Sequence, residues 1–162
     1  MKKKQFTIDI LEYQSAAELS KEDQNLVKKA KEITRNSYAP YSDFHVGAAL
    51  ILENGEIITG SNQENAAYPS GLCAERVALF WANSQYPDVP VKAIAVTARR
   101  KQNFVENPVA PCGACRQVLL ETETRFNKPI KVILVGEQKI EVIENAQSLL
   151  PINFDKSALI EH

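Results

Sequence analysis

Residues 71–76 read Gly-Leu-Cys-Ala-Glu-Arg, and residues 111–116 read Pro-Cys-Gly-Ala-Cys-Arg. These two segments contain every cysteine of the chain: Cys73, Cys112 and Cys115. Each cysteine group opens a stretch with helical periodicity, so the pattern predicts two helices that begin at cysteines. The positive end of a helix lowers the pKa of a thiol and stabilises the thiolate that binds metal. The two segments therefore predict thiolate ligands at helix starts.

Around these segments, helical and strand patterns alternate along the chain. Helices are expected over residues 21–36, 73–85 and 113–126, and strands over residues 45–52, 56–60, 92–98, 130–135 and 139–143. Asn54-Gly55 is a strong tight-turn signal between the first two strands. This alternation favours a layered α/β domain with a mixed sheet.

The length of 162 residues corresponds to one ordinary domain. Residues 4–13 alternate apolar and polar positions, which favours an edge strand or an ordered arm. We therefore expect residues 1–19 to form an N-terminal arm or edge strand, and residues 20–162 to form a single domain.

The charge and hydropathy patterns exclude several classes of partner. The chain has 19 basic and 20 acidic residues and a net charge of -1, without the basic face that binders of long nucleic acid carry. No apolar run reaches the ~18 residues of a membrane span, and the N-terminal segment lacks the apolar core of a signal peptide. We therefore expect no long nucleic acid and no membrane partner. A cytoplasmic location is expected, where thiols stay reduced.

The cysteine count admits several interpretations. A C-x-x-C pair alone could be a redox site, but that leaves Cys73 unexplained. A structural zinc site needs four protein ligands, and His45 or His162 could supply the fourth, although neither lies in a metal-ligand spacing. Buried inert thiols are also common. Three ligands and an open fourth position for water are typical of catalytic zinc, which the count favours.

Glu75 and Arg76 follow Cys73 in the first turn of a predicted helix. A carboxylate there can reach a water on the zinc ion without binding the metal itself. The alternative is an acid stabilised only by the helix dipole. Arg76 is a predicted hydrogen-bond donor to a thiolate, which would offset the charge of three thiolates, and Arg116 is another candidate. Either arginine could instead form a surface ion pair.

The order of these motifs resembles the small, three-cysteine cytidine deaminases. Zinc deaminases carry a ligand-x-Glu motif followed by Pro-Cys-x-x-Cys, and this chain has Cys73-Ala74-Glu75 followed by residues 111–115. Further matching stretches are residues 37–42 with Phe44, 46–49, 60–62, 64–66, 115–117, and 149–151 with Phe154. The resemblance extends from about residue 20 to residue 155.

The resemblance implies a three-layer α/β/α sandwich with a mixed central sheet. It implies one Zn²⁺ per chain, held by Cys73, Cys112 and Cys115, and Glu75 as the group that moves protons. The reaction implied is hydrolytic deamination of cytidine, and of deoxycytidine, to the uracil nucleoside and ammonia in pyrimidine salvage. Residues 20–162 would then form the catalytic domain.

The resemblance also implies the substrate contacts and the assembly. The contacts expected are Phe44 beside the base, Asn62 and Glu64 on the ribose hydroxyls, and the backbone of Ala66 and Ala74 on the pyrimidine. The family further implies a homotetramer, in which an aromatic residue of a neighbouring subunit, here Phe154, completes each site.

Two other functions remain open from the sequence. One is deamination of another cytosine-bearing nucleoside, such as a blasticidin-type compound. The other is a non-catalytic, zinc-stabilised interaction module. The chain departs from the family pattern in its longer N-terminal arm, in the expanded connection at 99–110, and at Glu121-Thr122-Glu123, where an acid followed by an aromatic is expected. These departures concern subunit packing and the rim of the site.

Overall fold

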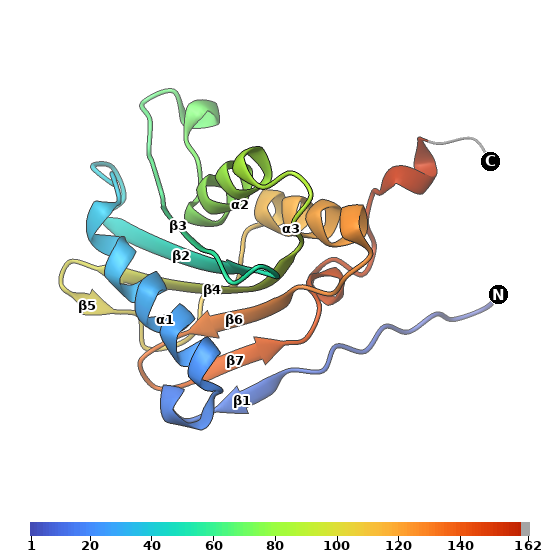
Figure 1. Ribbon diagram of the computed structural model, residues 1–162, viewed down its shortest axis with the longest axis horizontal. Helices are drawn as coiled ribbons and strands as arrows, with labels where there is room; N and C mark the ends of the chain where they lie inside the picture. Colours follow the sequence, from blue (N-terminus) through green and yellow to red (C-terminus); the bar gives the residue numbers. More distant parts are fainter. Residues whose placement is uncertain (160–162) are drawn as a thin grey trace.

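The computed structural model describes residues 1–159 and contains, within them, one mixed sheet of seven strands with helices on both faces (Figure 1). The strand order is β1 (Leu11–Tyr13), β7 (Ile140–Ile143), β6 (Lys131–Val135), β4 (Val91–Arg100), β2 (Phe44–Leu52) and β3 (Ile57–Ser61), and β5 (Asn103–Phe104) pairs with β4. The helices are α1 (Lys21–Ile33), α2 (Ala74–Gln85) and α3 (Gly113–Phe126). The predicted three-layer α/β/α sandwich is confirmed.

Alternation along β2 assigns its side chains to the two faces of the sheet. Ala48 and Leu50 belong to a buried cluster with the apolar side chains of α2 and α3, such as Leu79. Ala49 and Ile51 belong to a second cluster with the apolar side chains of α1. Because both faces of the central strands are covered, these strands are apolar at nearly every position.

Strand direction explains why α2 and α3 begin at the same edge of the sheet. β3 and β4 are each antiparallel to β2, so they run in the same direction. α2 follows β3, and α3 follows β4 after the short returning strand β5. The residues that precede the two helices, Cys73 and Cys112, line one cavity together with residues 96–98 in the carboxyl half of β4. In open α/β sheets this edge is where ligands bind. The topology thus brings the two cysteine-bearing segments to one place.

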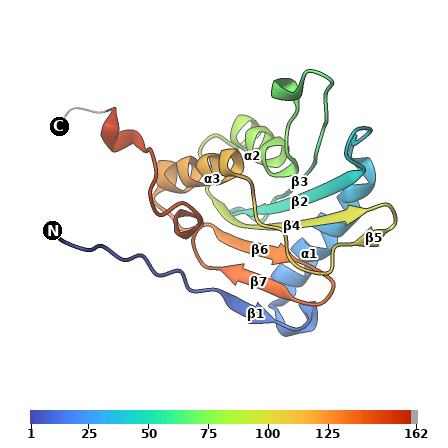
Figure 2. The ribbon, with the colours of Figure 1, turned by 180° about the vertical axis from the view of Figure 1, so that it is seen from behind.

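Two segments differ from the predicted strand pattern. Of residues 4–13, only Leu11–Tyr13 pair with a neighbouring strand, because β7 offers just four residues, and Phe6, Ile8 and Ile10 are exposed. In the predicted 99–110 connection, β4 continues to Arg100 and the chain turns back as β5. Figure 2 shows the N-terminal arm leaving the sandwich on the same side as the C-terminal segment before residue 160.

Gly60, near the end of β3, holds α2 close to the sheet. A Cβ atom at this position would lie 2.5 Å from Ala74 O and 2.7 Å from Ala78 N, both backbone atoms of α2. We expect Gly60→Ala to lower the free energy of unfolding by about 1–3 kcal/mol, because α2 must shift outward. It should also weaken zinc binding, since α2 begins at Cys73. Urea unfolding and a zinc competition titration measure the two effects.

Gly113→Ala is the matched control, because a Cβ atom there meets no atom within 4 Å. Its free energy of unfolding should stay within about 0.5 kcal/mol of the wild-type value. If Gly60→Ala is as stable as Gly113→Ala, the close packing of α2 against the sheet does not require a glycine at position 60.

Candidate active site

The three cysteines meet where the two helices begin. Cys73 is the N-cap of α2, Cys112 is the N-cap of α3, and Cys115 lies in the first turns of α3. The Cys73 and Cys112 Sγ atoms are 3.8 Å apart, and the Cys112 and Cys115 Sγ atoms are 3.5 Å apart. All three sulfurs lie within 4.8 Å of one another, and none forms a disulfide.

This spacing fits a zinc ion. Tetrahedral coordination at Zn–S distances of about 2.3 Å places ligand sulfurs about 3.8 Å apart. Hydrogen bonds from Cys115 first, and also from Arg76, lower the pKa of Cys73 to about 5, whereas the pKa of Cys115 is raised, chiefly by its contact with Cys73. Three thiolates this close repel one another, so a bound cation is needed to keep all three in the charged form. The cluster is therefore suited to hold one zinc ion.

Neither predicted fourth ligand joins the cluster in the part of the chain that the structure describes. The His45 ring is engaged elsewhere, with Ser37 and Asp43, and His162 lies outside the described residues. Three protein sulfurs match the ligand count of a catalytic zinc site rather than that of a closed structural one.

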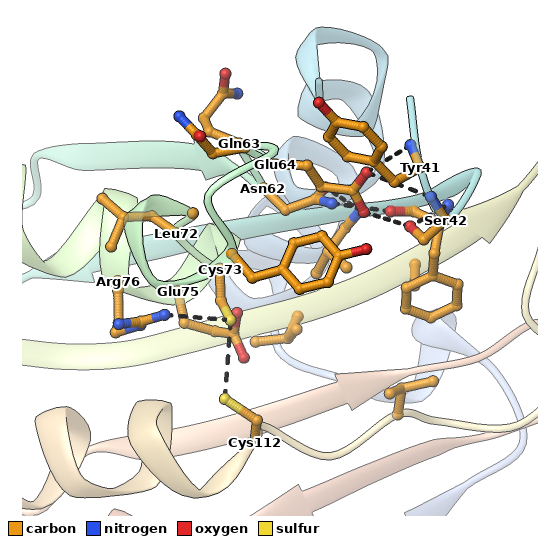
Figure 3. A pocket seen from close by; sticks show the side chains of 18 of the residues that line it. Tyr41, Ser42, Asn62, Gln63, Glu64, Leu72, Cys73, Glu75, Arg76 and Cys112 are labelled. Carbon is orange, nitrogen blue, oxygen red and sulfur yellow. Dashed lines mark hydrogen bonds between the residues drawn. The ribbon is translucent and has the colours of Figure 1, made fainter. Parts of the chain in front are cut away.

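Glu75 lies beside these sulfurs and is nearly buried. It occupies the first turn of α2, is 4% exposed, and lines the cavity next to Cys73 (Figure 3). Burial, above all, raises the pKa of Glu75, and negative charge on Cys73 adds to the effect. A raised carboxyl pKa favours the protonated form and suits a group that both accepts and donates a proton.

The two arginines of the motifs have different partners. Arg76 Nη2 lies 3.8 Å from Cys73 Sγ, whereas its Nε is buried without a hydrogen-bond partner among residues 1–159. Arg116 instead donates to two backbone carbonyls, Pro111 O at 2.8 Å and Leu149 O at 3.1 Å. Arg76 therefore contributes positive charge at the sulfurs, and Arg116 ties the segment before Cys112 to the chain near Leu149.

A cavity of about 590 Å³ opens above the cluster, which is within the usual size range of small-ligand sites. Its wall includes Phe44, Asn62, Glu64, Cys73, Glu75 and Cys112 among the residues predicted for the site. The cavity wall also includes residues to which the sequence motifs assign no role, among them Tyr41, Ser42, Tyr68, Thr97, Val109 and Ala110. In the sequence, Tyr41 and Ser42 lie within the matched stretch 37–42, and Ala110 directly precedes Pro111. Their positions next to the motifs are the signal that could have identified them as site residues.

Both polar atoms of the Asn62 side-chain amide form hydrogen bonds with the protein backbone. Its Oδ1 accepts a hydrogen bond from Val46 N at 2.7 Å, and its Nδ2 donates to Phe44 O at 2.9 Å. Asn62 therefore holds the first residues of β2 beside the cavity. An amide has a further donor hydrogen and a further lone pair, so a contact with a ribose hydroxyl stays a prediction.

Glu64 is held by the loop that precedes β2. Its Oε2 accepts hydrogen bonds from Tyr41 N at 2.9 Å and Ser42 N at 3.3 Å, and the Ser42 hydroxyl donates to Oε1. The Ser42 hydroxyl first, and then the Tyr41 amide, hold the pKa of Glu64 below its usual range. Glu64 is therefore an ionised acceptor at the mouth of the cavity (Figure 3).

The remaining predicted site residues lie outside the cavity wall of this single chain. Ala66 is exposed and Ala74 is fully buried at the start of α2. Phe154 is 59% exposed, and its backbone carbonyl accepts a hydrogen bond from Gln117 Nε2 at 2.8 Å. The predicted substrate and inter-subunit roles of these three residues stay predictions.

Fold and site together define an α/β protein with a three-cysteine site suited to catalytic zinc at the wall of a cavity. Residues 20–128 match the family model of the cytidine and deoxycytidylate deaminase zinc-binding region. The chain is 50% identical over 98 residues to a cytidine deaminase of Halalkalibacterium halodurans, covering 60% of this chain and 70% of that protein. It is 35% identical over 143 residues to a probable cytidine deaminase of Dictyostelium discoideum, covering 85% of this chain and 90% of that protein.

Solved structures show the same likeness. The crystal structure of cytidine deaminase from Burkholderia pseudomallei superposes with a TM-score of 0.68 at 41% identity, covering 80% of this chain and 97% of that one. The chain therefore belongs to the cytidine and deoxycytidylate deaminase family.

Proposed function

We propose that this protein hydrolyses the exocyclic amino group of cytidine, and of deoxycytidine, and releases ammonia and the uracil nucleoside. The observation that carries the proposal is the three-sulfur cluster with the buried carboxyl of Glu75 beside it, at the wall of a cavity of about 590 Å³. The names of the relatives support the same reaction.

The residues divide the chemistry between them. Zinc, when bound by the three cysteines, supplies the Lewis acidity that makes water a nucleophile near neutral pH. Glu75 accepts the proton of the attacking water and delivers it to N3 of the cytosine ring. Glu75 then accepts the proton of the hydroxyl added at C4 and passes it to the amino group, which leaves as ammonia while the C4 carbonyl forms. Its raised pKa supports both transfers, because the carboxyl must alternate between its two forms.

The cavity wall suggests how the nucleoside is oriented. We place Phe44 beside the base, and the backbone of Ala66 and Ala74 near the pyrimidine. Glu64 is ionised and can only accept hydrogen bonds, so it suits the hydroxyl donors of a ribose, and Asn62 would contact the same sugar. A ligand without these hydroxyls leaves the polar groups unpaired, which gives selectivity.

The two alternatives are not favoured by the relatives' names or by the site. A blasticidin-type substrate would have to place a different group on Glu64. A non-catalytic zinc module needs neither a cavity next to the metal ligands nor a buried carboxyl there. Loss of stability is the usual cost of burying such a group, and it is tolerated mainly at functional sites.

A substrate panel tests the proposal. Initial rates on cytidine, deoxycytidine and a blasticidin-type nucleoside are compared with the zinc-loaded protein. We expect kcat/KM to be highest for cytidine and deoxycytidine. Turnover of the third compound alone would move the assignment to a different cytosine nucleoside, and a zinc-loaded protein that turns over none of them would support the interaction module.

We further propose a homotetramer that works in cytoplasmic pyrimidine salvage on a small-molecule substrate. Exposed aromatic residues support the assembly, since Phe80 and Trp81 on α2 are 47% and 51% exposed and Phe154 is free to reach a neighbour. The free cysteines suit a reducing compartment. Among residues 1–159, no helix has the length and apolar character needed to cross a membrane. Sedimentation equilibrium tests the tetramer, and a monomer would contradict it.

A further inference from the structure

The loop of residues 37–43, between α1 and β2, is closed by a side-chain bridge that the proposed chemistry does not use. Ser37 Oγ lies 2.6 Å from His45 Nδ1, and His45 Nε2 lies 3.1 Å from Asp43 Oδ1. Ser37 begins the loop and Asp43 ends it, with its φ angle at 52°. His45 therefore joins the two ends of what we call the 37–43 loop.

Serine, histidine and aspartate in hydrogen-bond contact also suggest a nucleophile, but the geometry argues against one. The Ser37 hydroxyl donates its single proton to Thr34 O at 2.8 Å, so Ser37 Oγ accepts a hydrogen bond from His45. Neither Ser37, Asp43 nor His45 lines the cavity. A hydroxyl that accepts from the imidazole is not activated for attack.

The side chain of His45 lies on the α1 face of the sheet, behind the cavity. Gly47, two residues further along β2, faces α1, where a Cβ atom would lie 2.1 Å from Ala30 O. Arg99 on β4 is the register partner of His45 and occupies the same face. Its guanidinium donates to Thr34 Oγ1 at 3.2 Å and to the Lys101 carbonyl, so it does not replace His45 as a partner of Asp43.

Each ring nitrogen of His45 contacts one end of the loop. Nδ1 lies against Ser37 Oγ, and Nε2 lies against the Asp43 carboxylate. The charged groups around the ring are Asp43 on the loop, Arg99 on β4, and Glu64, whose pKa the charge of His45 helps to lower. Removal of the ring therefore breaks the side-chain link between the two ends.

The 37–43 loop is also the element that orients Glu64. The Tyr41 and Ser42 amides and the Ser42 hydroxyl all donate to the Glu64 carboxylate. Ser42 Oγ in turn accepts a hydrogen bond from Phe44 N at 3.1 Å, directly before His45. Tyr38 N donates to Asn62 O at 3.0 Å and Glu64 N donates to Tyr38 O at 2.8 Å, so the start of the loop is fixed to the Glu64 segment by backbone, and His45 restrains its far end at Asp43.

We propose that His45 is a positioning residue that ties Ser37 to Asp43 and thereby holds Glu64 in place for the ribose hydroxyls. This inference rests on the proposed function, since it concerns the sugar contact of the same site. A folded chain without the His45 ring should therefore bind the sugar less well, while the chemistry at Glu75 is left unchanged.

Steady-state kinetics of variants test the proposal. In His45→Gln, KM for cytidine should rise about tenfold over the wild-type value, the size expected when one hydrogen bond to a charged group is lost. The value of kcat should change less than about twofold, because the variant leaves Glu75 and the three cysteines in place.

Asp43→Asn keeps the shape of the loop, since asparagine tolerates a positive φ angle, and should raise KM similarly. The double variant should show no further increase, because the two residues form one bridge. Asp88→Asn, at an exposed site, is the matched control and should keep the wild-type KM. Folded His45 and Asp43 variants that keep the wild-type KM, or that lose kcat with KM unchanged, would overturn the proposal.

Amide hydrogen exchange separates this inference from the proposed function. The Tyr41 and Ser42 amides donate to Glu64, so they should exchange with solvent about tenfold faster in His45→Gln than in the wild type. If these amides exchange at the wild-type rate in a folded His45→Gln protein, the bridge is refuted. If they exchange faster while the wild type does not turn over cytidine, the bridge stands and the proposed function fails.

Discussion

Glu75→Gln is expected to lower kcat for cytidine by about 10²–10⁴-fold, the contribution of general acid–base catalysis. Glutamine keeps the shape of the side chain but can neither accept the proton of water nor return it to the leaving amino group. Because Glu75 also sits in the cavity wall, loss of substrate positioning can add to the effect. Stopped assays that quantify uridine measure the change.

The same variant should bind zinc normally and unfold no more easily than the wild type. Burial raises the pKa of Glu75, so the folded protein disfavours its ionised form at neutral pH, where the unfolded chain carries the charge freely. Replacing the carboxyl removes this cost. Glu121→Gln, on an exposed turn of α3, is the matched control and should keep full activity. A Glu75→Gln protein with wild-type kcat would refute the assigned role.

Cys112→Ala is expected to abolish stoichiometric zinc binding and, with it, turnover of cytidine. Removing one of three sulfurs should weaken zinc binding by more than the roughly 10–100-fold that follows loss of an outer hydrogen-bond partner. Zinc binding also stabilises the folded chain, so the thermal midpoint should fall toward that of the chelator-treated wild type. Metal analysis and thermal unfolding with and without chelator measure both effects.

Ala114→Ser is the matched control for this change. Ala114 lies between Cys112 and Cys115 and is exposed, so a hydroxyl there leaves the three sulfurs in place. This variant should keep one zinc ion per chain and its activity. A Cys112→Ala protein that retains one zinc ion per chain would show that the cluster is not the metal site.

The positions of the cysteines and of Glu75 could be predicted because they depend on short-range patterns. Helical periodicity after Cys73 and Cys112 places each cysteine at a helix start, and both cysteines are the observed N-caps. The strand directions then bring the two helix starts together. Glu75 follows within the first turn of α2, so its position beside the sulfurs is a consequence of the same helix start.

Features that depend on long-range partners could not be predicted in the same way. The alternation over residues 4–13 predicts a strand, but pairing with β7 stops at Leu11, opposite Val142, which only the assembled sheet shows. The backbone contacts of Asn62 and the bridge formed by His45 join residues brought together by the meeting of β2, β3 and the 37–43 loop. The division of the chain at residue 20 stays a prediction.

The most direct test follows the absorbance of cytidine after addition of metal-analysed protein, with a chelator-treated sample and an ammonia assay alongside. Conversion of cytidine to uridine with equal release of ammonia, about one zinc ion per chain, and loss of turnover on chelation that added zinc restores, is the predicted result. Turnover that survives complete removal of the metal, or a zinc-loaded protein that leaves cytidine and deoxycytidine unchanged, would contradict it.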